Sequence, residues 1–204
     1  MPAYSDSGVG VRKGVLRLRS RSTVTALTYM APNAASPSPD GITIRRASTA
    51  DLPVLGVLGA SLLRQHYTFD PLRFMAPSAH LEDGYAWFLG TQLAEGDAAV
   101  FVAERSGTVI GYVYVALEPQ SWKELREAAG YIHDVVVAPE AQRHGVAAAL
   151  IETACDWLRS NGAPRVILGT AEKNDRAQRL FERLGFRRTM IEMTKELQPP
   201  RDTD

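Results

Sequence analysis

The residues best suited to chemistry lie in one stretch of the chain. A β-type run from Tyr131 to Val137 is followed by the turn Q-R-H-G-V-A-A-A at residues 142–149, which opens an apolar helical pattern. Gly145 and the small side chains after it leave the backbone of this turn accessible. The first N–H groups of a helix have no acceptor within the helix and lie at the positive end of its dipole. The spacing therefore predicts an anion site, with a diphosphate as the expected guest.

Polar side chains on the preceding run could move protons. Tyr131, His133 and Asp134 stand within four positions of one another. An imidazole with a pKa near 6.5 can accept a proton at neutral pH. Strict alternation would place Tyr131, His133, Val135 and Val137 on one face of the strand and Asp134 on the other, unless a bulge interrupts it. His133 is therefore the first candidate for a general base.

Several regular elements must position these residues. Alternating or β-branched runs predict strands, helical spacing predicts helices, and Ser106-Gly107 predicts a hairpin. A cap at Thr49 or Asp51 precedes the first helix. Residues 121–129 are expected to form a short polar helix or a loop. Strands are predicted at 42–46, 98–104, 108–117, 131–137, 165–170 and 187–197, and helices from about 52, at 78–95, 143–160 and 174–184. This order indicates an α/β fold, with a sheet of mixed direction and helices on its faces.

Composition narrows the class of protein. The 204 residues carry no formal net charge, which gives no reason to expect nucleic acid or an anionic membrane as partner. No apolar run reaches the roughly 18 residues that span a bilayer. A single cysteine, Cys155, excludes an internal disulfide and suits a reducing, cytoplasmic setting. Residues 1–40 read as a disordered basic, Pro- and Ser-rich extension, with a transit peptide or a natural start at Met30 as alternatives. A domain at 41–198 and a tail at 199–204 follow.

Two motifs together resemble the GNAT superfamily of N-acetyltransferases. The first is the turn Gln142-x-x-Gly145-x-Ala147, in which alanine replaces the last glycine of the usual pattern. The second is N-D-R-A-Q-R-L-F-E-R-L-G-F at 174–186, about 30 residues later, with a strand between them. The resemblance covers about 42–197. It implies a mixed sheet of six to seven strands flanked by about four helices, with acetyl-CoA as cosubstrate and no metal.

The resemblance also implies which residues hold coenzyme A. The pantetheine arm is expected on the backbone of the fourth strand where that strand splays from the fifth, and the pyrophosphate is expected in the turn. Asn174 is expected to contact the cofactor, to cap its helix, or both. Phe181 stands where the family usually has a tyrosine acid, which leaves Tyr131, Tyr112, Tyr114 or water to protonate the thiolate. The predicted cofactor-binding residues are Val135, Val136, Val137, Gln142, Arg143, His144, Gly145, Val146, Ala147, Ala148, Asn174 and Phe181.

The expected activity is direct transfer of the acetyl group to a primary amine of a small molecule in a ternary complex. An alkyl amine with a pKa near 10.4 is almost fully protonated at pH 7, so a base is needed. His133 stands where many relatives carry a glutamate base, and a purely structural hydrogen-bonding role is equally open. Asp134 is a second catalytic or structural candidate, and Tyr131 a third.

The acceptor side is defined less sharply by the sequence. Glu118 and Glu124 could attract a cationic amine. The walls of the acceptor pocket are expected among His66, Tyr67, Phe69, Trp87 and Trp122, each of which could equally belong to the core. A protein or peptide acceptor and a non-catalytic acyl-CoA-binding module are the alternative functions. Many relatives form dimers, so a homodimer is left open.

Overall fold

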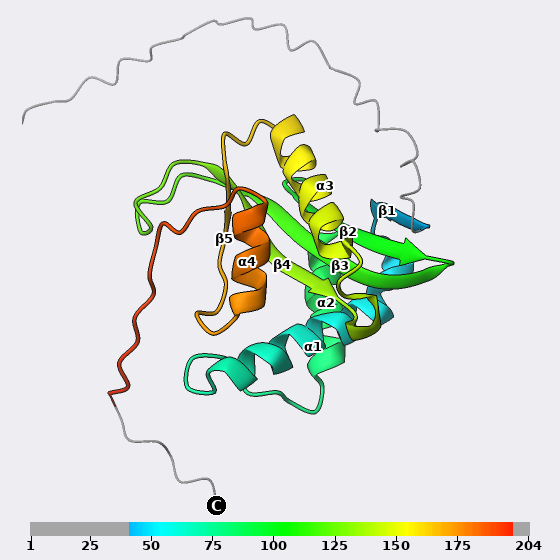
Figure 1. Cartoon of the computed structure of the whole chain (residues 1–204), viewed down its shortest axis with the longest axis horizontal. Coiled ribbons are helices and arrows are strands. Elements are labelled where there is room, and N and C mark those ends of the chain that lie inside the picture. The colour runs from blue at the N-terminus through cyan, green and yellow to red at the C-terminus, as the bar shows by residue number, and fades with distance from the viewer. Residues whose placement is uncertain (1–40, 198–204) are drawn as a thin grey trace, which may run out of the picture. The chain divides into compact units, whose positions relative to one another are not determined.

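The computed structural model describes residues 41–197 and contains one five-stranded sheet in the order β1-β2-β3-β4-β5 (Figure 1). Neighbouring strands are antiparallel except for β4 and β5, which are parallel. The strands are β1 (Ile42–Arg46), β2 (Ala98–Arg105), β3 (Thr108–Glu118), β4 (Ala129–Val137) and β5 (Val166–Leu168). The helices are α1 (Leu52–Phe69), α2 (Leu81–Gln92), α3 (Val146–Ser160) and α4 (Asp175–Arg183). The predictions for 1–40 and for the tail at 199–204 lie outside the described residues.

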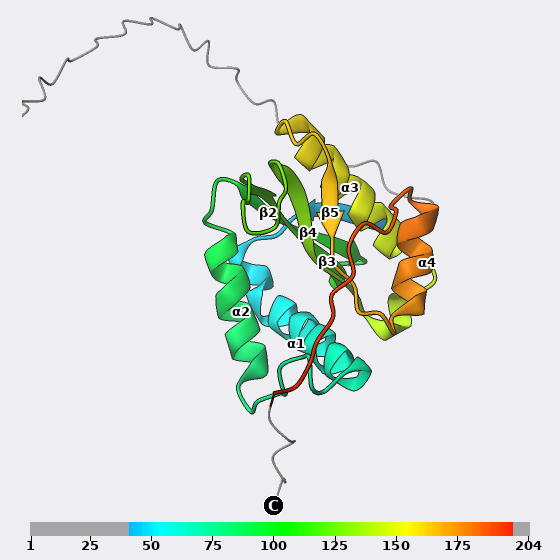
Figure 2. The same cartoon turned by 90° about the vertical axis from the view of Figure 1, so that its left-hand side faces the viewer.

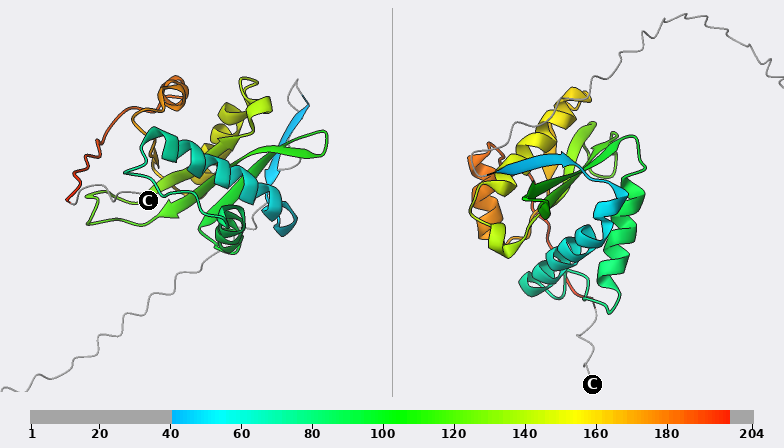
Figure 3. Two further views of the ribbon diagram at one scale, coloured as in Figure 1. Left: turned by 90° about the horizontal axis from the view of Figure 1, so that it is seen from below. Right: turned by 90° about the vertical axis from the view of Figure 1, so that its right-hand side faces the viewer.

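The sheet is covered on both faces. Val100 and Tyr112 point toward α1 and α2, whereas Val113 and Leu150 belong to the cluster beneath α3. Figures 1 and 3 show α1 and α2 on one side of the sheet and α3 on the other. Because β2 and β3 are covered on both faces, their sequences read as nearly continuous apolar runs. Within residues 41–197, no helix combines the length and apolar character that a membrane span requires.

Two glycines let α2 approach α1 closely. A Cβ atom added at Gly56 would lie 2.4 Å from the Glu82 carbonyl oxygen, and one at Gly59 would lie 2.1 Å from the Tyr85 ring. Both distances are shorter than a real carbon contact, so only glycine fits at this crossing. The close approach brings Tyr85 against the face of the sheet that carries Tyr112.

The start of α1 is fixed by a buried carboxylate. Asp51 accepts hydrogen bonds from the Ser48 N–H at 2.7 Å and from both terminal nitrogens of Arg45 at 2.9 Å. The Asp51 carboxylate therefore closes a capping box on the short 3₁₀ turn Thr49–Asp51 that leads into α1. Arg45 also donates to Glu104 on β2 at 2.8 Å, which ties the cap to the sheet.

Residues 41–197 contain five strands where about six to seven were expected, and the prediction of a strand at 187–197 is wrong. The segment has β-type residues but pairs with no strand among the described residues, and a strand needs a partner for its backbone groups. Its large apolar side chains are 81–89% exposed: Met190, Ile191, Met193 and Leu197. Residues 119–128 form a loop closed by an isolated bridge between Ser121 and Arg126.

Candidate active site

A bulge in β4 decides where the polar side chains point. Tyr114 pairs with Asp134 and Val115 with Ile132, so His133 is the extra residue between them. The bulge turns His133 and Asp134 toward the same face, the one covered by α1 and α2. Val135 packs on the opposite, α3 side. The prediction that His133 shares a face with Val135 and Val137, opposite Asp134, is therefore wrong, because it assumed an uninterrupted alternation.

His133 is held between two tyrosines and a glutamate. Its ring stacks on Tyr114 at 4.8 Å and on Tyr131 at 4.6 Å between ring centroids, with interplanar angles of 20° and 23°. Its Nε2 lies 3.2 Å from Oε1 of Glu118 at the end of β3. Burial lowers the pKa of His133, while the charge of Glu118 acts in the opposite direction. The imidazole is thus both oriented and biased toward its neutral form.

Glu118 itself is partly neutralised. Arg126, from the loop before β4, lies 3.6 Å from the Glu118 carboxylate and 2.5 Å from Glu124. The Arg126 side chain is only 15% exposed, and it also donates to the Pro119 carbonyl at 2.8 Å. This arrangement ties the loop to the strand that carries His133.

Asp134 lies deeper, among tyrosines. It accepts a hydrogen bond from the Tyr112 hydroxyl at 2.9 Å, and burial raises its pKa. Nearby, burial raises the pKa of Tyr112 and of Tyr85 as well. These groups form a polar cluster inside the α1–α2 layer. Within this cluster the Asp134 carboxylate is held by hydrogen bonding.

The parallel pair β4–β5 separates halfway along its length. Its register ends at Ile132 opposite Leu168, while β4 continues to Val137. A cavity of about 70 Å³ lies at the point of separation, and its walls include His133, Val135, Asn174, Phe181 and His66 of α1. Figure 2 views the molecule from the β5 side of the sheet, with α1 below β5 and α4 to its right. Predicted cofactor residues and the predicted base therefore meet at one cavity.

The register shows which backbone groups of β4 face the gap. The Ala138 N–H donates to the Ile110 carbonyl at 2.9 Å, which fixes the alternation of the antiparallel ladder. By that alternation Val136 bonds to β3, whereas the N–H and C=O of Val135 and Val137 point to the β5 side. Of the three valines expected to bind the pantetheine arm, Val135 offers both backbone groups and Val137 offers its N–H, because the Val137 carbonyl accepts from the Gln142 amide.

The predicted turn begins α3 as expected. Gly145 is the N-cap with φ 76°, and Arg143 also has a positive φ of 69°. The helical ladder starts with the Ala149 N–H donating to the Gly145 carbonyl, so the N–H groups of 146–148 precede it. Gln142 braces the turn, because its amide donates to the Val137 carbonyl at 3.0 Å and accepts from Arg176. Residues 143–145 are exposed beside this helix start.

Phe181 and Asn174 both lie at the cavity. Phe181 packs edge-on against Phe186 at 5.9 Å, and the Asn174 side chain caps α4 by accepting from the Ala177 N–H at 3.2 Å. The Tyr114 hydroxyl donates to Gln92 at 2.7 Å, and the Tyr112 hydroxyl is engaged with Asp134.

Tyr131 is the remaining candidate acid. Within residues 41–197 its hydroxyl makes no hydrogen bond, and a Cβ at Gly169 beside the cavity would lie 3.5 Å from it. Burial raises the pKa of Tyr131, so its hydroxyl stays protonated at neutral pH.

The sequence did not predict the position of every residue in the site. Glu118 was predicted only to attract a cationic acceptor, and the structure also places its carboxylate against His133. The pairing follows from the bulge, for which the sequence carries no local signal. Trp87 and Trp122, considered as pocket walls or core, are 72% and 82% exposed. No metal-type cluster of three His, Cys, Asp or Glu side chains occurs within 41–197.

The described residues thus form an α/β fold whose mixed sheet splays beside the start of α3. Comparison with known proteins identifies the family. The family model described as "Acetyltransferase (GNAT) family" matches residues 62–186, and the chain therefore belongs to the GNAT family. This confirms the resemblance drawn from the two motifs.

Two related proteins and one solved structure show what the chain is similar to. The chain is 32% identical over 168 residues to a mycothiol acetyltransferase of Thermomonospora curvata, covering 79% of this chain and 50% of that protein. It is 35% identical over 98 residues to a glucosamine 6-phosphate N-acetyltransferase of Trypanosoma brucei brucei, covering 48% and 64%. Its fold is similar to that of aminoglycoside N-acetyltransferase AAC(6')-Iy in complex with CoA, with a TM-score of 0.61, 19% identity, and coverage of 81% and 100%. The chain spans about half the length of the first of these relatives.

Proposed function

We propose that the protein transfers the acetyl group of acetyl-CoA to the primary amine of a small molecule. The observation that carries this proposal is the placement of His133 at the cavity between β4 and β5, with Glu118 fixing its ring. A base beside the gap in which the family holds its donor is the arrangement that amine acetylation requires. Two relatives are named mycothiol acetyltransferase and glucosamine 6-phosphate N-acetyltransferase, and these names favour a small acceptor over a protein.

Donor binding is assigned to backbone groups. The N–H and C=O groups of Val135 and the N–H of Val137 face the gap and suit the amide groups of a pantetheine arm, while the Val137 carbonyl is held by Gln142. The N–H groups of 146–148, at the positive end of α3, suit a pyrophosphate. Arg143, exposed in the same turn, can add a charged contact to a phosphate oxygen.

Proton removal is assigned to His133. With Nε2 directed at Glu118, the neutral ring donates its proton there and leaves Nδ1 as the acceptor. The incoming ammonium gives a proton to Nδ1, directly or through water, and the free amine attacks the thioester carbonyl carbon. A C–N bond forms as the C–S bond breaks, and the attacking nitrogen loses its second proton to water, which leaves a neutral amide. The lowered pKa of His133 keeps the ring unprotonated at neutral pH, as a base must be.

Proton delivery to the leaving thiolate is assigned to Tyr131. Its hydroxyl is free of other hydrogen bonds within residues 41–197 and stands by Gly169 at the cavity. Phe181 occupies the position at which the family usually has the acid, and its phenyl ring has no proton to donate. Since the thiol of coenzyme A resembles a free cysteine with a pKa near 8.5, water can also supply this proton at a lower rate.

Thiol release from acetyl-CoA in the presence of a panel of primary amines tests the proposal. We expect acceleration by at least one small amine, and a loss of about 100-fold or more in kcat for His133→Ala with unchanged affinity for acetyl-CoA by calorimetry. Tight binding of acetyl-CoA without acceleration by any amine would instead support the acyl-CoA-binding module. Loss of binding together with turnover in His133→Ala would show that the residue is structural.

A further inference from the structure

The cavity between β4 and β5 has a second histidine in its wall. His66, in the last turn of α1, lines the cavity together with His133 of β4. Figure 2 shows α1 crossing below β5 at this end of the sheet. The proposed acetyl transfer gives a role to His133 and none to His66.

The His66 ring is held by its own helix. Its Nδ1 lies 2.9 Å from the Leu62 carbonyl oxygen, and because a carbonyl oxygen only accepts, Nδ1 carries a proton and donates. Phe69 and Phe74 pack edge-on against the ring, with ring centroids 5.9 Å and 4.9 Å away. Within residues 41–197 the other ring nitrogen, Nε2, makes no hydrogen bond. In the neutral ring Nε2 is therefore an oriented hydrogen-bond acceptor that lacks a donor.

Stabilisation of α1 does not account for this free nitrogen. The bond to Leu62 uses Nδ1 alone, and packing against the two phenylalanine rings needs no nitrogen at all. The His66 side chain is half-buried and stands at the cavity wall next to Leu62. A molecule bound in the cavity would supply the donor that the described part of the chain does not.

The wall of this cavity is polar but carries no fixed charge. Among the described residues that line it there is no carboxylate, lysine or arginine, and its polar side chains are those of His66, His133, Thr170 and Asn174. Glu118, beside His133, is already engaged by that histidine and by Arg126. A second ammonium group on the acceptor would therefore be buried without a counter-ion, which is costly. A hydroxyl group avoids this cost and can donate to Nε2 of His66.

We propose that Nε2 of His66 accepts a hydrogen bond from a hydroxyl group of the acceptor, which makes amino alcohols the substrate class. This rests on the proposed acetyl transfer and defines its acceptor more closely. While His66 holds the hydroxyl group, the amine of the same molecule meets Nδ1 of His133 and loses its proton there. Two contacts restrict the bound amine to fewer orientations, which favours attack on the thioester. His66 is thus a substrate-binding residue that sets specificity, and His133 remains the base.

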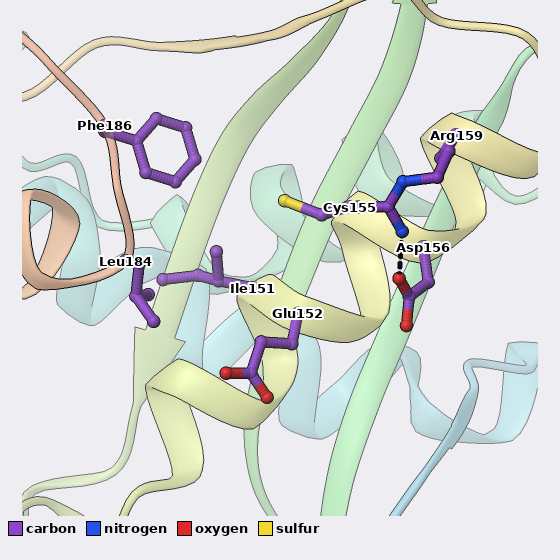
Figure 4. Close-up of a pocket in the computed structure, with 7 residues that line it drawn as sticks. All are labelled: Ile151, Glu152, Cys155, Asp156, Arg159, Leu184 and Phe186. Atoms are coloured by element: carbon purple, nitrogen blue, oxygen red, sulfur yellow. Dashed lines mark hydrogen bonds and ion pairs between the residues drawn. The ribbon is translucent and has the colours of Figure 1, made fainter.

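A second cavity provides a control for binding elsewhere on the protein. It has a volume of about 420 Å³ and lies between α3 and the corner that follows α4 (Figure 4). Its polar side chains are charged, and Figure 4 shows two of them, Asp156 and Arg159, paired with each other. An amine bound there would lie against α3 and not against His66 of α1. Glu152→Gln in this second cavity should therefore leave the acceptor preference unchanged.

Matched pairs of amines test the preference for a hydroxyl group. Ethanolamine and vicinal aminocyclohexanol carry it, and propylamine and cyclohexylamine are their hydroxyl-free counterparts. In the natural protein kcat/KM should be about five- to tenfold higher for the amino alcohol of each pair, which is the effect of one hydrogen bond between neutral groups. His66→Phe keeps a planar ring and should abolish the preference by raising KM for the amino alcohols. Its kcat/KM for propylamine and its affinity for acetyl-CoA should not change.

Two further variants separate the hydrogen bond from packing. His66→Gln places an amide oxygen near the position of Nε2 and should retain most of the preference. His80→Phe makes the same change as His66→Phe at an exposed histidine and should retain all of it. The absence of any preference in the natural protein, or an equal preference in His66→Phe, would overturn the proposal.

Nitrogen NMR distinguishes the His66 contact from acetyl transfer itself. The chain has four histidines, and isotope labelling of their ring nitrogens gives one Nε2 resonance for each, with His66→Phe identifying that of His66. In the presence of coenzyme A, which has no acetyl group to transfer, ethanolamine should shift the His66 Nε2 resonance and propylamine should not. A shift without turnover of any amine would refute acetyl transfer and support the contact. No shift, or equal shifts with both amines, would refute the contact even where turnover is observed.

Discussion

The substitution Glu118→Gln isolates the electrostatic part of the proposed mechanism, because it removes one charge and keeps the size of the side chain. Glu118 and His133 are 31% and 30% exposed in their side chains and 3.2 Å apart. At that distance two unit charges attract by about 1.3 kcal/mol even at the dielectric constant of bulk water. Arg126, 3.6 Å from Glu118, offsets part of this attraction. The stabilisation of a protonated His133 by Glu118 is therefore about 1 kcal/mol.

Glu118→Gln should raise relative activity at low pH and lower the plateau value of kcat. The charge of Glu118 raises the pKa of His133 against the lowering by burial, so its removal lowers that pKa further. The base must be unprotonated, and the acidic limb of the kcat profile should therefore move to lower pH in Glu118→Gln. The plateau should fall roughly five- to tenfold, because about 1 kcal/mol of stabilisation for the developing imidazolium is lost.

The assay is thiol release at saturating acetyl-CoA and amine between pH 5.5 and 9. Glu124→Gln serves as the matched control, since Glu124 contacts Arg126 but not His133. Its profile should match that of the natural protein, and the KM for acetyl-CoA should stay constant in both variants. An unshifted acidic limb in Glu118→Gln, or the same shift in Glu124→Gln, would refute the assignment of Glu118 as the residue that positions His133.

Three further outcomes are expected. Gly145→Ala places a side chain at φ 76°, which costs about 1 kcal/mol, and calorimetry should show weaker coenzyme A binding with little loss of fold. Gly59→Ala drives a methyl into the Tyr85 ring and should lower the free energy of unfolding by at least about 2 kcal/mol in a urea titration. Arg45 lowers the pKa of Asp51, so this stabilisation is present above the unfolded pKa near 4 and is lost as pH falls below it. Asp51→Asn should be less stable at pH 7 and lose less stability on acidification.

Local sequence was sufficient to predict most elements and the helix start. The β-type runs of β1 to β4, the helical spacing of α3 and α4, and Gly145 are local signals, and each was found within a few residues of its expected place. The backbone conformation of such a turn depends on residues inside it. The family resemblance depended on the same local motifs, and the match over residues 62–186 confirms it.

Pairing between distant segments was decided only in three dimensions. The bulge that turns His133 toward Glu118 arises from the register of β4 on β3, and the loss of the strand expected at 187–197 arises from the absence of a partner within the described part of the chain. Both are long-range relations between backbone groups, which no local pattern encodes. By itself the sequence located the helix start at which we predict an anion site. The tertiary structure decided which side chains stand beside it, because register sets the face on which each one lies.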